Sequence, residues 1–362
     1  MFYYLFYPLR DQWIVFNLFR YITFRSAAAS LTAFFVCLYF GPAITEWLRS
    51  LSAIGSTQRE HAEKLHALQK EKGKVPTMGG ILIILGILMA SVLWGNLSNR
   101  LLLICMVTLV WFGMIGFIDD YLKVVSKSTK GLRSLSKLAG QVIWGIVLGW
   151  YLFRDPNYSG ILHVPFLKHS GVYLGIFYVP FVILVLAGAS NAVNLTDGLD
   201  GLAIGCSIFA AGAFGIISYV SGHAVFAEYL KIPFFSESGE LTVFCSSMAG
   251  AGAGFLWYNA YPATIFMGDT GSLSLGGALG AVAVCIKKEL VLLIVGGVFV
   301  WEALSVILQV TSFKLHRKRI FKMAPFHHHL QLLGWSETKV TIRLWIVAFL
   351  LAVIGLSTLK IR

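Results

Sequence analysis

The stretch "LLLICMVTLVWFGMIGFIDDYLKV" (residues 101–124) decides the fold class. Residues 101–118 carry no charged side chain and approach the roughly 20 residues that a helix needs to cross a bilayer. The run ends at two adjacent carboxylates, Asp119 and Asp120, with Lys123 shortly after them. Ionised groups beside hydrocarbon are costly unless they are paired, metal-bound or wet. We therefore expect a transmembrane helix that ends in a cluster of charged side chains, and we expect this cluster to have a function.

The composition extends this interpretation to the whole chain. Of the 362 residues, 57% are hydrophobic and 13% are charged, whereas a soluble protein carries about 25% charged residues. The mean hydropathy is +0.76. The 36 glycines suit close helix–helix approach in lipid, and the five cysteines lie in apolar stretches without ligand spacing. The sequence predicts an all-α polytopic membrane protein that forms one domain over residues 1–362.

Apolar runs predict ten transmembrane helices, and the aromatic N-terminus lacks the small-residue cleavage site of a signal peptide. The predicted spans are about 22–45, 76–97, 101–118, 137–153, 172–190, 200–222, 241–259, 264–286, 290–313 and 338–359.

Ten spans put both termini on one side of the membrane and five loops on the other. These loops are 46–75, 119–136, 191–199, 260–270 and 314–337. They hold more of the basic residues than the opposite face, which places them in the cytoplasm. The net charge of +12 fits this bias, or a basic mouth for an anionic substrate. Nucleic acid is not an expected partner, because the basic residues are scattered over short loops.

All the polar motifs fall on this predicted cytoplasmic face, where we expect an active-site cleft. They are "GFIDDYLKV" (116–124), "SNAVNLTDGLDG" (190–201), "NAYPATIFMGDTGSLSLGG" (259–277) and "APFHHHLQLLGW" (324–335).

Five of the 17 acidic residues lie in these motifs: Asp119, Asp120, Asp197, Asp200 and Asp269. A single aspartate there is as easily a helix cap, but five on one face suit a hard divalent cation such as Mg²⁺. Asn194 adds an amide oxygen. Lys123 shares a face with Asp119 if the helix continues, and it suits phosphate binding. The glycines around Asp269 are weak evidence for a phosphate loop, because the Walker pattern is absent.

The three histidines, His327, His328 and His329, lie too far from a terminus for a purification tag. Successive residues on a helix point about 100° apart, so three neighbours do not converge on one zinc ion. A polar wall that binds substrate is the favoured interpretation, and water-exposed loop histidines are the alternative.

The arrangement favours phosphoryl transfer between a soluble and a lipidic substrate over transport. A transporter places charges near the bilayer midplane. Only Glu302 lies in the middle of a predicted span, and a hydrogen bond between helices is its preferred interpretation.

The motifs also resemble a known family, the polyprenyl-phosphate N-acetylhexosamine-1-phosphate transferases. The resemblance rests on "DDYLK" (119–123) and "NLTDGLDG" (194–201). "PTMGG" (76–80), "FMGDTGSL" (266–273) and the histidine motif are similar to the branch that uses a muramoyl-pentapeptide substrate. The match runs from about residue 60 to the C-terminus, with no departure at the motif positions.

The resemblance implies a reaction, a fold and a location. UDP-N-acetylmuramoyl-pentapeptide and undecaprenyl phosphate would give lipid I and UMP with Mg²⁺, in peptidoglycan synthesis. The alternatives are another UDP-N-acetylhexosamine as donor, or a ten-span transporter. The family further implies a ten-helix fold, a homodimer, and a place in the bacterial cytoplasmic (inner) membrane with the active site facing the cytoplasm.

The resemblance also assigns site residues. The catalytic residues would be Asp119, Asp120, Lys123 and Asp269, with Asp269 as the magnesium ligand. The substrate-binding residues would be Lys72, Asn194, Asp197, Asp200, Asn259, Phe266, His327, His328 and His329. Two mechanisms stay open. The lipid phosphate attacks directly with Asp119 as base, or an aspartate attacks first and forms a covalent intermediate.

Overall fold

The computed structural model describes the chain except residues 52–74, 127–130, 157, 159, 166–170 and 361–362. The described part is built of helices, and its strands form one two-stranded antiparallel hairpin. The hairpin pairs β1 (Ile161–His163) with β2 (Gly171–Tyr173). The sequence predicted no strand here, and its predicted span 172–190 begins within β2. The prediction of an all-α polytopic fold therefore holds apart from this small hairpin.

Each of the ten predicted spans overlaps a helix. These helices are α2 (Ile22–Ser50), α4 (Gly80–Trp94), α5 (Arg100–Val125), α6 (Ser134–Arg154), α7 (Tyr178–Thr196), α8 (Leu202–Ser221), α10 (Gly239–Asn259), α11 (Gly268–Cys285), α13 (Gly297–His316) and α15 (Glu337–Ser357). Short elements fill the connections: α1 (Phe2–Phe6), η1 (Tyr7–Asp11), η2 (Ile14–Arg20), η4 (Gly175–Phe177), α9 (Ala224–Leu230), η5 (Ser236–Ser238), α12 (Glu289–Val295) and α14 (Phe326–Leu332).

Seven of the helices in the described residues are long and apolar enough to cross a membrane by themselves. They include α2, α5 and α15, whereas α4 is apolar but shorter. This number supports a multi-pass membrane protein. The remaining predicted spans correspond to α10 and α11, which are rich in glycine, serine and alanine.

Helix α11 lies at the centre of the bundle, and every residue from Thr270 to Cys285 is buried. It packs against α5, α7 and α4. A Cβ atom on Gly277 would lie 2.6 Å from the ring of Phe112 on α5, so small residues allow this close packing. Because α11 has no surface facing lipid, it does not need the high hydropathy of an outer helix.

Several predicted boundaries were wrong, and two of them have a clear local cause. The predicted span 290–313 is divided into α12 and α13, because the glycine pair Gly296–Gly297 interrupts the helix. The sequence also placed Asp119 and Asp120 where a span gives way to a loop. The structure continues α5 to Val125, since no helix-breaking residue follows the two aspartates.

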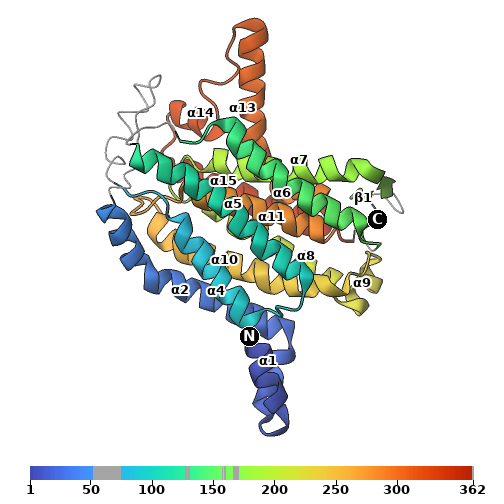
Figure 1. The fold of residues 1–362 in the computed structure, drawn as a ribbon. Helices are drawn as coiled ribbons and strands as arrows, with labels where there is room; N and C mark the ends of the chain where they lie inside the picture. Colours follow the sequence, from blue (N-terminus) through green and yellow to red (C-terminus); the bar gives the residue numbers. More distant parts are fainter. Residues whose placement is uncertain (52–74, 127–130, 157, 159, 166–170, 361–362) are drawn as a thin grey trace.

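Helix α13 projects away from the packed bundle (Figure 1). Only Val298, Phe299, Glu302 and Ser305 of this helix are buried. After α13 the chain returns to the short helix α14, which contacts both α13 and α15. The histidine run, predicted to lie in a loop, is therefore part of a helix that packs against the bundle.

Candidate active site

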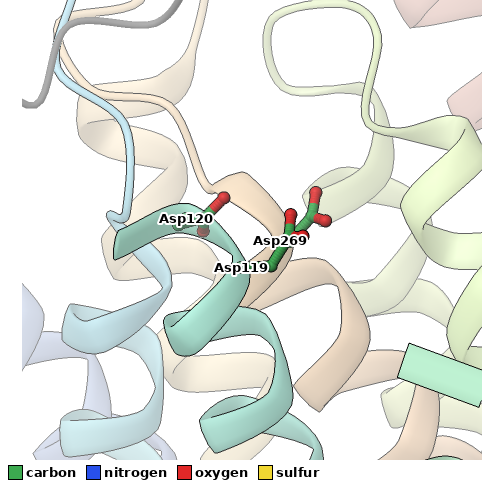
Figure 2. A group of neighbouring side chains, drawn as sticks. All are labelled: Asp119, Asp120 and Asp269. Carbon is green, nitrogen blue, oxygen red and sulfur yellow. The ribbon is translucent and has the colours of Figure 1, made fainter. Parts of the chain in front are cut away.

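Three carboxylates meet where the C-terminal part of α5 approaches the first turn of α11 (Figure 2). They are Asp119, Asp120 and Asp269, and a ligand oxygen of each lies within 4.8 Å of the others. The side chains of Asp119 and Asp120 are almost fully buried, and that of Asp269 is 15% exposed. The structure thus brings together the carboxylates that the family resemblance assigned to catalysis.

Two glycines permit this meeting. A Cβ atom on Gly116 of α5 would lie 2.1 Å from the main-chain oxygen of Asp269, so the start of α11 rests directly on the α5 backbone. Gly268 has a φ of +71°, in the left-handed region that favours glycine. A Cβ atom there would lie 2.6 Å from Oδ2 of Asp120. Both positions hold the loop before α11 close to the carboxylates.

The two adjacent aspartates of α5 have different partners, as their angular separation on a helix predicts. Asp120 Oδ2 accepts hydrogen bonds from the main-chain N–H (2.9 Å) and the hydroxyl (2.8 Å) of Thr270. Asp119 Oδ1 accepts from the main-chain N–H of Leu132 at 2.7 Å. Asp120 therefore secures the first turn of α11, a capping function that the sequence had offered as an alternative for Asp269.

Two lysines lie among the carboxylates. Lys123 Nζ is 2.5 Å from Asp119, 3.6 Å from Asp120 and 3.4 Å from Asp269. Lys137 Nζ, on the first turn of α6, is 2.9 Å from Asp119 and 2.5 Å from Asp269. The sequence motifs identified Lys123 as a candidate site residue but did not identify Lys137. Lys137 enters the site because α6 packs beside α5, and its position at the start of a span was the available signal.

The donor set of this cluster fits a hard divalent cation. Carboxylate oxygens are ligands that Mg²⁺ prefers, and three carboxylates against two ammonium groups leave one net negative charge. Such a charge attracts a metal ion without excluding phosphate. A cavity of about 830 Å³ lined by Arg100, Trp150 and Arg154 lies at the opposite end of α5 and α6, so it is separate from the cluster.

The segment 194–201 borders the carboxylates. Asn194 Oδ1 accepts a hydrogen bond from the Ser272 hydroxyl of α11 at 3.1 Å. Asp197 follows the last residue of α7. Burial, together with the carboxylates of Asp269, Asp120 and Asp200, raises the pKa of Asp197 to about 8. A carboxyl group with this pKa is largely protonated near neutral pH and is able to donate a hydrogen bond.

Two of the predicted substrate-binding residues make hydrogen bonds that connect loops. Asp200 Oδ2 accepts from the main-chain N–H of Ala263 at 3.0 Å. Asn259 accepts from the main-chain N–H of Gly201 at 3.0 Å and donates to the carbonyl of Ile265 at 2.9 Å. Both side chains are buried. They hold the segment 194–201 against the loop 260–267.

The "PTMGG" motif has a structural function next to Phe266. The main-chain N–H of Phe266 donates to Pro76 (2.8 Å), and the N–H groups of Gly79 and Gly80 donate to Phe266 (2.8 Å) and Met267 (2.9 Å). The motif thereby fixes the backbone that leads to Asp269. Lys72, the less certain active-site lysine, lies outside the described residues.

The three histidines of α14 have three different partners. His327 Nδ1 lies 3.2 Å from Glu302 Oε2, and His328 Nδ1 lies 3.0 Å from Gln331 Oε1. His329 Nδ1 accepts from the main-chain N–H of Lys322 at 3.1 Å. His327 and His328 are buried, whereas His329 is partly exposed. The hydrogen bond that Glu302 was predicted to make between helices is confirmed, since it connects α13 to α14.

Comparison with known proteins identifies the class. The sequence profile of glycosyl transferase family 4 matches residues 101–287, and the chain belongs to this family. The matched region contains the carboxylates, both site lysines and the segment 194–201.

Full-length relatives then specify the branch. The phospho-N-acetylmuramoyl-pentapeptide-transferase of Solidesulfovibrio magneticus is 53% identical, and the match covers 100% of both chains. The enzymes of the same name from Koribacter versatilis (51%, covering 96% of this chain and 95% of the relative) and Desulfotalea psychrophila (48%, covering 100% of both) are similar. The family resemblance that the motifs predicted is confirmed.

Proposed function

We propose that this chain transfers phospho-N-acetylmuramoyl-pentapeptide from its UDP-linked precursor to undecaprenyl phosphate, giving lipid I and UMP. The names of the full-length relatives support this activity. The observation that carries the proposal is the buried group of Asp119, Asp120 and Asp269 with Lys123 and Lys137 between them. This group supplies the alternating charges that phosphoryl transfer needs, at the end of a membrane helix.

The cofactor we propose is Mg²⁺, held by Asp269 with the α5 carboxylates nearby. Asp269 is the most exposed of the three, so it is the carboxylate best placed to share a cation with substrate phosphates. The ion would neutralise charge on the diphosphate.

The protein side chains would then do the following work. An oxygen of the lipid phosphate forms a bond to the β-phosphorus of the UDP-sugar. The bond from that phosphorus to the bridging oxygen breaks, and UMP leaves with the electron pair. Lys123 and Lys137 offset the negative charge that spreads over the phosphate oxygens. Asp119, held ionised by both lysines, takes the last proton of the lipid phosphate where one remains.

Direct attack is the proposed route. A covalent mechanism requires an aspartate oxygen that acts as a nucleophile, yet the salt bridges to Lys123 and Lys137 reduce the nucleophilicity of Asp119. One oxygen of Asp120 also accepts two hydrogen bonds from Thr270. A donor with a chiral phosphorothioate at the β-position distinguishes the routes: single displacement inverts this phosphorus, and a covalent intermediate retains its configuration.

We further propose ten membrane crossings in the bacterial inner membrane, with the carboxylates on the cytoplasmic side. A homodimer is the expected assembly from the family resemblance.

The experiment uses purified protein in detergent. UMP should appear when UDP-N-acetylmuramoyl-pentapeptide, Mg²⁺ and a polyprenyl phosphate are all present, and should be absent when the lipid is omitted. UDP-N-acetylglucosamine as donor tests the alternative substrate. A transporter makes no UMP in detergent, so vesicles that accumulate the nucleotide sugar without UMP release would refute the proposal.

A further inference from the structure

The interior of α13 contains one carboxylate, Glu302, that the reaction above does not use. Its side chain is buried and faces α14. The main-chain N–H of His327 lies 3.2 Å from Oε1 and 3.3 Å from Oε2, and His327 Nδ1 lies 3.2 Å from Oε2. A single carboxylate therefore engages both the backbone and the ring of one histidine. Such a group is costly to bury and is retained where its hydrogen bonds are needed.

This contact determines which ring nitrogen carries the proton. An ionised carboxylate only accepts hydrogen bonds, so the Nδ1 that faces Glu302 carries the hydrogen. In the neutral imidazole, Nε2 is then an acceptor with a free lone pair. Carboxylates behind catalytic and metal-binding histidines act in the same way, since they fix the tautomer and the ring orientation.

The other nitrogen of the ring points toward the segment 194–201. Among the residues that the structure describes, His327 Nε2 is buried and has no hydrogen-bond partner. A Cβ atom on Gly198 would lie 2.2 Å from it, so the ring edge lies directly against the residue that follows Asp197. An unpaired buried polar atom costs about 1–3 kcal/mol, and the structure keeps Nε2 in this state with the ring packed on Gly198.

We propose that Glu302 is a positioning residue for nucleotide binding. It holds His327 as the Nδ1–H tautomer, so that the ring edge at Nε2 packs against Gly198 and fixes the 197–198 backbone that borders the bound nucleotide. Glu302 itself touches no substrate. The inference rests on the proposed function, because it assumes that the UDP part of the donor binds beside the segment 194–201.

The test compares Glu302→Gln and Glu302→Asp with Ser305→Ala. Ser305 lies one turn further along α13, is buried, and donates to the main-chain oxygen of Glu302 at 2.7 Å, so it controls for local packing. Gln keeps the shape, but its amide group is able to donate to Nδ1 and so allows the other tautomer. We expect kcat/KM for the UDP-sugar to fall about 10- to 100-fold in Glu302→Gln. The KM for polyprenyl phosphate should not change, Asp should recover part of the loss, and Ser305→Ala should resemble wild type.

The ¹⁵N spectrum of the His327 ring supplies a readout that needs no turnover. Wild-type protein should show a protonated Nδ1 and an unprotonated Nε2, and Glu302→Gln should lose this preference. A wild-type tautomer or a wild-type KM for the UDP-sugar in Glu302→Gln would overturn the proposal. If Ser305→Ala lost as much kcat/KM for the UDP-sugar as Glu302→Gln, the effect of Glu302 would be explained by local packing alone.

A second variant keeps the inference testable if Glu302→Gln does not fold. Gly198→Ala displaces the same ring from its other edge, so it should raise the KM for the UDP-sugar selectively. An unchanged KM would contradict the assigned position of Nε2. Failure of the proposed function is a separate result, because wild-type protein would then release no UMP while its ring spectrum still reports on Glu302.

Discussion

Asp269 and Asp120 lie in the same cluster but have different functions, and substitutions separate them. Asp269→Asn removes the charge of the most exposed carboxylate, so activity should stay near background at every practical Mg²⁺ concentration while the melting temperature is nearly unchanged. Asp120→Asn weakens the two hydrogen bonds from Thr270, so it should also cost about 1–2 kcal/mol of stability. UMP release and thermal unfolding measure the two effects. If Asp269→Asn turned over at the wild-type rate, the metal would have to be assigned to the α5 carboxylates Asp119 and Asp120.

Lys137 provides a second prediction for single residues. Lys137→Gln removes a cation that lies within 3 Å of both Asp119 and Asp269, so phosphate binding loses its charge partner. We expect kcat/KM for the UDP-sugar to fall at least about tenfold, an effect typical of one lost charge-assisted contact. Arg133→Gln is the matched control, because Arg133 is an exposed cation one turn earlier. If Lys137→Gln were as active as Arg133→Gln, the assignment of Lys137 to the site would be wrong.

The sequence predicted some of the site residues and missed others. The carboxylates and Lys123 could be predicted from the sequence because they follow an apolar run in a short motif. Lys137 as a site residue and His327 as the partner of Glu302 could not be predicted, since each depends on how two helices pack. Asp200 and Asn259 were predicted from their motifs, and only the fold shows that their side chains bond to the backbone of neighbouring loops.

At the level of helices, the contact between α5 and α11 should be the most sensitive to added volume. Gly116→Ala places a Cβ atom 2.1 Å from the main-chain oxygen of Asp269, so the two helices must separate and the carboxylates must move. We expect loss of turnover together with a lower melting temperature. Gly188→Ala is the control, because nothing lies within 4 Å of its added Cβ atom, and alanine favours a helix over glycine by about 0.5–1 kcal/mol. Similar behaviour of the two variants would contradict the close packing of α11.

The turn between α11 and α12 should make stability depend on pH. Lys287 is buried there, its Nζ donates to the carbonyls of Tyr158 (2.5 Å) and Ile161 (3.0 Å), and burial lowers its pKa to about 8. Between pH 8 and the ordinary lysine value near 10.5, the unfolded chain binds the proton that the folded chain has released. Stability from this group therefore rises with pH across that window. Lys287→Met should abolish the rise, as measured by the difference in unfolding free energy between variant and wild type from pH 7 to 10.5.

The helices themselves were more predictable than their boundaries. Apolar runs located every long helix because lipid-facing residues must be hydrophobic. The break at Gly296 and the extension of α5 depend on local backbone geometry, which hydropathy does not report. The central position of α11 could not be predicted from hydropathy, because it depends on the helices that surround it.

For the molecule as a whole, the contacts already place four connections on one face. Asp119 meets Asp269, Asn194 meets Ser272, and His327 lies against Gly198, so the ends of α5 and α7, the helix α14 that follows α13, and the start of α11 are together. The loop that contains η5 belongs to the opposite face, because α8 and α10 each separate it from this group by one helix length. The distribution of basic residues then indicates which side of the membrane this face occupies. Five basic residues lie at or after the end of α13 on the site face: Lys314, Arg317, Lys318, Arg319 and Lys322.

We predict that this face is cytoplasmic, since positive residues are retained on that side. Single cysteines would replace Ser126, Ser336 and Ser236, which are all exposed, in a background without the five buried native cysteines. An impermeant thiol reagent added to sealed right-side-out cells should label Ser236→Cys. It should label Ser126→Cys and Ser336→Cys only after the membrane is opened. Labelling of Ser126→Cys or Ser336→Cys in sealed cells would place the carboxylates outside, where the proposed UDP-linked donor would not reach them from the cytoplasm.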